Sequence, residues 1–152
     1  MVLMVECDFP ECTTFGAVVR FSIELEKGAA GIYEELAKNP KAASGATLFK
    51  ELAELHKKRM ASVENMRQQK LNEMILEPIQ DMKRELYLID TKVPAGADAK
   101  AGAQFVMKVE ETSSRFYVDA AKIAKMIMAE GSRFMDKLGK ENLAIKARLA
   151  AL

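Results

Sequence analysis

The sequence lacks most of the residues from which common functional sites are built. It has one His, two Cys and no Trp, and its 23 basic and 22 acidic residues leave a net charge of +1. A single His excludes a multi-histidine zinc site, and two Cys exclude a four-cysteine site. A balanced charge gives no electrostatic reason to expect nucleic acid as a partner. No Gly-rich phosphate loop or Ser/His/Asp set is present either.

Long apolar runs are also missing. Lys or Glu interrupts every apolar stretch before it could span a membrane, and Glu6 cuts short the apolar start, so no secretory signal is predicted. We therefore expect a cytoplasmic protein without a membrane partner, in which Cys7 and Cys12 are reduced thiols. Cys12 lies just ahead of a predicted helix, whose dipole favours a thiolate. Cys7 and Cys12 could therefore be redox-active thiols, or they could have no functional role.

What the sequence does have is helical periodicity. An apolar fraction of 49% suits a single domain over residues 1–152. Pro and Gly residues separate four segments of helical spacing. The first covers about residues 14–38, and the second begins at 44 or 47 and ends near 74. The third covers about 98–126 and the fourth about 132–152. Residues 1–13 form an N-terminal extension and 75–97 a crossover, while about eight residues join the helices of each half. This predicts an all-α antiparallel four-helix bundle of two hairpins joined by a long crossover.

A repeat between the two halves supports this arrangement. Glu26 and Tyr33 of the first predicted helix recur at the same spacing as Glu110 and Tyr117 of the third. Two related hairpins would then pack about a pseudo-twofold axis. Both tyrosines could donate hydrogen bonds to the carboxylates.

Each of the four apolar stripes carries one ionisable residue near its middle: Glu26, His56, Glu110 and Glu141. Burying such groups without partners is very costly. A bound cation could compensate them, because facing helices of a bundle are where such sites are built. Alternatively, Arg59, one turn after His56, could neutralise the carboxylates without metal. In a third interpretation, one or two of these residues lie at a stripe edge and reach solvent.

These segments resemble the rubrerythrin branch of the ferritin-like superfamily. The resemblance rests on Glu26-x-x-Ala29-x-x-x-Tyr33-x-x-Leu36-Ala37, its echo Glu110…Phe116-Tyr117…Ala121, and Phe49-x-x-Leu52-Ala53-Glu54. In that family the first and third helices each give one Glu to a di-iron centre, and the second and fourth each give a Glu-x-x-His pair. Here those pairs read His56-x-x-Arg59 and Glu141-x-x-Ala144. Both family histidines are missing, and no Cys-x-x-Cys rubredoxin module is present.

The resemblance implies a homodimeric, ferritin-like metal protein. It would carry peroxide- or oxygen-linked redox chemistry at non-haem iron, or less readily manganese, served by an unidentified redox partner. The ligands would be Glu26, His56, Glu110 and Glu141, with Tyr33, Tyr117 and Arg59 beside them. The alternative is a non-catalytic, degenerate relative without a cofactor. In it Arg59 replaces the metal, and the bundle acts as a binding or assembly module.

Overall fold

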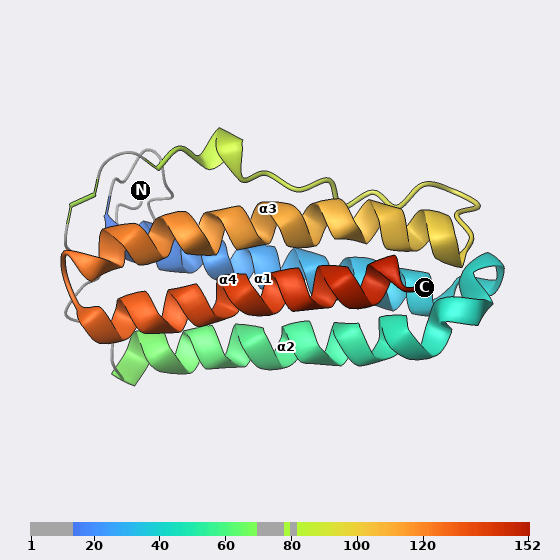
Figure 1. The fold of residues 1–152 in the computed structure, drawn as a ribbon, viewed down its shortest axis with the longest axis horizontal. Coiled ribbons are helices and arrows are strands. Elements are labelled where there is room, and N and C mark those ends of the chain that lie inside the picture. The colour runs from blue at the N-terminus through green and yellow to red at the C-terminus, as the bar shows by residue number, and fades with distance from the viewer. Residues whose placement is uncertain (1–13, 70–77, 80–81) are drawn as a thin grey trace, which may run out of the picture.

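The described part of the chain folds into four long helices. The computed structural model describes residues 14–69, 78–79 and 82–152, so Cys7 and Cys12 lie outside the described residues. The helices are α1 (Phe15–Lys38), α2 (Ala46–Gln69), α3 (Ala99–Lys125) and α4 (Ala129–Ala150), with short 3₁₀ helices η2 (Pro40–Gly45) and η3 (Arg84–Leu86). Figure 1 shows α1 with α2 and α3 with α4 as hairpins, and residues 82–98 running along α3. This confirms the predicted all-α four-helix bundle. None of the described helices is long and apolar enough to cross a membrane.

Local signals in the sequence set several helix ends. The Thr14 side chain accepts a hydrogen bond from the Ala17 N–H at 3.3 Å and begins α1. The Asp98 carboxylate does the same for Ala101 at the start of α3, at 2.8 Å. Asn39 ends α1 because Pro40 follows it. These bonds confirm the helix starts that the sequence predicts near residues 14 and 98.

The link between α3 and α4 is shorter than predicted. We expected about eight residues and a helix starting at 132 after a break at Gly131, but α4 begins at Ala129 and contains Gly131. The N–H groups of Ile127 and Met128 both donate to the Ala124 carbonyl, at 2.9 and 2.7 Å, so the chain turns at once. Ser132 could have capped a helix that started there, but Met128 is the N-cap residue of α4. The second helix was predicted to reach residue 74, and its last part lies outside the described residues.

A buried polar layer divides the apolar core into two clusters. In α1 the first cluster takes residues 15–25 and the second takes 29–36, with Glu26 between them. In α4 the first ends at Leu138 and the second begins at Ile145, with Asn142 between them. His56 and Arg59 take the corresponding place in α2. The polar residues therefore lie at one level of the bundle.

The two hairpins meet closely where α1 crosses α3, and a pair of glycine variants tests this. A Cβ added at Gly102 would lie 2.8 Å from a methyl group of the fully buried Leu36, whereas at Gly31 it would meet nothing within 4 Å. Gly31→Ala should raise the free energy of unfolding by about 1 kcal/mol through helix propensity. Gly102→Ala should lower it by roughly 1–2 kcal/mol because overpacking outweighs propensity. Urea unfolding measures both, and equal stabilisation would contradict the close approach.

Candidate functional site: an ionic network in the bundle core

Side chains from all four helices meet in the polar layer. They are Glu26 from α1, His56 and Arg59 from α2, Glu110 from α3 and Asn142 from α4, and each is 4% exposed or less. Charged groups are almost never buried so deeply unless they are paired. The partners of each group therefore decide what the site can do.

His56 bridges the two carboxylates. Its Nδ1 lies 2.6 Å from Glu26 Oε1, and its Nε2 lies 2.7 Å from Glu110 Oε2. Only the imidazolium form can donate through both ring nitrogens. Burial lowers the pKa of His56, but the charge of Glu110 and the hydrogen bonds to both carboxylates outweigh it and raise the pKa to about 9. The ring is therefore a cation at neutral pH.

Arg59 uses all five of its N–H donors. Nε and Nη2 donate to the two oxygens of Glu26, each at 3.1 Å, as a bidentate pair. Nη2 also donates to Asn142 Oδ1 at 2.9 Å, while Nη1 donates to the Leu138 carbonyl at 3.3 Å and to Glu141 at 3.4 Å. Burial lowers the pKa of Arg59, but the charge of Glu26 outweighs this effect and raises the pKa above its usual value. A guanidinium satisfied in this way is a fixed positive charge.

The remaining donors complete the shells of the two carboxylates. Asn142 Nδ2 donates to Glu110 Oε1 at 2.6 Å, and Tyr33 donates to Oε2 at 2.6 Å. Tyr117 donates to Glu26. Burial and the neighbouring carboxylates raise the pKa of both tyrosines well above 10. Burial also raises the pKa of Glu26, but the hydrogen bond from His56 and the charge of Arg59 outweigh it and lower the pKa to about 2.

Most of the residues singled out in the sequence do converge. Glu26, His56, Glu110, Arg59 and both tyrosines share one network.

Glu141 was placed on the wrong face. Its side chain is 42% exposed and reaches Arg59 only from the edge, whereas the neighbouring Asn142 is fully buried. The buried stripe of α4 runs through 138, 142, 145 and 149. Sequence reasoning missed Asn142 because it looked for ionisable groups, although spacings of four, three and four residues would have revealed it.

The donor set does not fit a resident metal. A ligating imidazole needs a free lone pair, and both His56 nitrogens already face carboxylates. Both oxygens of Glu26 face Arg59, which cannot give up its proton. Within the part of the chain that the structure describes, no group of three His, Cys, Asp or Glu side chains is arranged to hold a metal ion.

Comparison with known proteins supports the fold and goes no further. No family model matches the chain, and no curated protein matches it. Among solved structures, it is similar to a hypothetical protein from Pyrococcus furiosus, with a TM-score of 0.64 and 21% identity over 94% of this chain and 90% of that one. This likeness places the protein among all-α four-helix folds.

We predict that His56 stays protonated well above neutral pH. Because it is the chain's single histidine, its ring proton signals can be followed by NMR without assignment. They should titrate with a pKa of about 9, whereas an unperturbed histidine titrates near 6.5. A midpoint near the unperturbed value would contradict the bridge between Glu26 and Glu110.

The same shifts predict how stability depends on pH. Folding raises the pKa of His56, so its contribution is complete below pH 6.5 and is lost as pH rises toward 9, about 3 kcal/mol in all. Folding lowers the pKa of Glu26, so its contribution is complete above pH 4.5 and is lost as pH falls toward 2. The free energy of unfolding, measured in urea, should therefore peak between these limits. His56→Gln should remove the alkaline slope and also reduce the acidic one, because Glu26 loses the His56 charge that helps to keep its pKa low.

Proposed function

We propose that the protein is a non-catalytic, rubrerythrin-like bundle in which Arg59 and His56 take the place of a metal, and that it acts as a binding or assembly module. The observation that carries the proposal is the full set of acceptors around the buried Arg59 guanidinium. This side chain stands where the resembled family has a metal-ligating histidine.

Charge balance supports this proposal. The carboxylates of Glu26 and Glu110 carry two negative charges, and Arg59 and the His56 imidazolium carry two positive charges. If His56 lost its proton to bind a divalent cation, Glu26, Glu110 and Arg59 would leave the core with a net charge of −1, and the cation would turn this into an uncompensated charge of +1. Uncompensated charge in a dry interior is very costly.

The burial of the network supports a non-catalytic role. A general base needs an acceptor within reach of a substrate, but His56 is 1% exposed and already protonated. Both carboxylates are equally buried and are surrounded by donors. The surface supports the assembly part of the proposal, because Leu86 and Leu88 of the crossover are 51% and 59% exposed. We propose a homodimer on this basis.

Removing the guanidinium tests the network directly. Arg59→Leu leaves Glu26 buried without its main partner, which should lower the free energy of unfolding by roughly 3–5 kcal/mol. Arg67→Leu is the matched control on the same helix, because Arg67 is 33% exposed and its one ion pair among the described residues is with Glu64 at 3.6 Å. The control should change stability by less than about 1 kcal/mol. Similar small losses in both variants would show that the network is not what holds the core together.

Native mass spectrometry tests the absence of a metal and the assembly together. The full chain is incubated anaerobically with ferrous or manganous ions, desalted and sprayed under non-denaturing conditions. We expect a dimer whose mass equals two chains without metal. One metal per chain that is lost on Glu110→Gln would overturn the proposal in favour of a metal-dependent oxidoreductase, and a monomer would remove the homodimer.

A further inference from the structure

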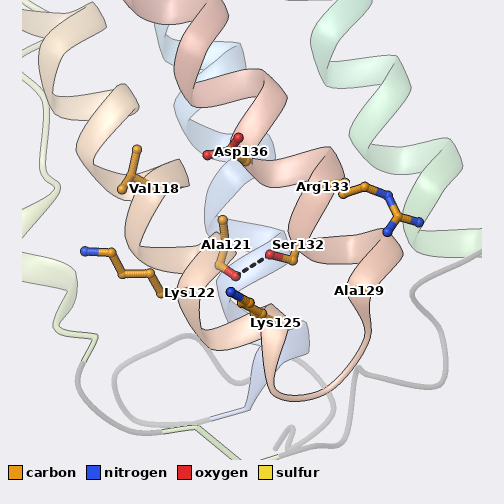
Figure 2. Close-up of a pocket in the computed structure, with 8 residues that line it drawn as sticks. All are labelled: Val118, Ala121, Lys122, Lys125, Ala129, Ser132, Arg133 and Asp136. Carbon is orange, nitrogen blue, oxygen red and sulfur yellow. Dashed lines mark hydrogen bonds between the residues drawn. The ribbon is translucent and has the colours of Figure 1, made fainter.

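A hollow of about 410 Å³ opens between the end of α3 and the start of α4. Figure 2 shows it at the turn that joins the two helices. Lys122 and Lys125 come from the last turns of α3, and Arg133 comes from the start of α4. Its volume lies within the range of small-molecule sites. It lies apart from the buried network and shares no residue with it.

The hollow carries uncompensated positive charge. Within the described part of the chain, Lys122, Lys125 and Arg133 form no ion pair, and all three side chains are exposed. Asp136 is the one acidic residue in the lining, and Lys140 pairs with it at 2.8 Å. The three cations therefore raise the local concentration of anions at this end of the bundle.

The frame of the hollow is fixed, whereas its charged side chains are free to turn. The Ser132 hydroxyl donates to the Ala121 carbonyl at 2.8 Å and ties α4 to α3, as the dashed line in Figure 2 shows. In that view Lys125 lies between the helices, and Lys122 and Arg133 extend to opposite sides. A ligand could draw the outer two cations inward, at the cost of their side-chain entropy.

We propose that this hollow binds the phosphate group of a small phosphorylated compound. Lys125 would meet the phosphate, and Lys122 and the fork of Arg133, which matches phosphate geometry, would close on it from either side. The short apolar side chains of Ala121 and Ala129 would contact the carbon part of the ligand. This proposal does not depend on whether Arg59 or a metal neutralises the buried carboxylates. Metal analysis of the core tests the proposed function, and anion titration of the hollow tests this proposal, so either one can be wrong without the other.

Inorganic phosphate and pyrophosphate are the probes. The ¹⁵N-labelled full chain is titrated with each at low ionic strength, with sodium chloride matched to the same ionic strength as the blank. We expect saturable amide shifts confined to residues 118–136. The triple variant K122A/K125A/R133A should weaken pyrophosphate binding about tenfold. The control K27A/K58A/K100A removes the same charge from exposed positions elsewhere and should leave the affinity within about twofold.

A second variant separates site binding from general charge attraction. Ala129→Glu puts a carboxylate into the hollow at the first residue of α4, where the helix dipole favours it, so the fold should be kept. It should abolish the confined shifts. Equal weakening in both triple variants, shifts spread over all basic surfaces, or no saturation by about 10 mM pyrophosphate would each overturn the proposal.

Discussion

The bidentate ion pair between Arg59 and Glu26 is the constraint on which the rest of the core depends. Removing two charges from water costs more than their attraction returns unless every other donor and acceptor is also met. Arg59 has three further N–H groups, and they require acceptors from α4 at fixed positions. The pair therefore ties α1 to α2 and sets the rotation of α4 against both.

His56 extends this constraint to α3. Its ring joins Glu26 of α1 to Glu110 of α3 and stacks on Tyr33, with ring centroids 5.4 Å apart. The apolar clusters on either side are held by non-directional contacts, which oppose a slip of one helix turn less sharply than paired charges do. A slip would leave a charge without its partner, so the polar layer admits only one register.

The sequence predicted the local features more completely than the tertiary ones. Thr14, Asn39 and Asp98 end or begin helices through their own side chains and neighbours, and these ends were predicted correctly. Gly131 predicts a break because glycine disfavours helices, but α4 contains it as a buried residue of its first turn. Adjacent residues of a helix point about 100° apart, so a slightly misplaced stripe was enough to put Glu141 inside and Asn142 outside.

By itself, the sequence determined that four amphipathic helices form and that charged side chains lie on their apolar faces. It left open whether a metal, Arg59 or solvent compensates those charges. In the tertiary structure, His56 and Arg59 pair with the buried carboxylates in an internal network, because the partner of a buried charge lies on another helix and its distance is set by packing. The cationic hollow at the turn of α3 and α4 arises in the same way, from lysines and an arginine that are unremarkable until two helices bring them together.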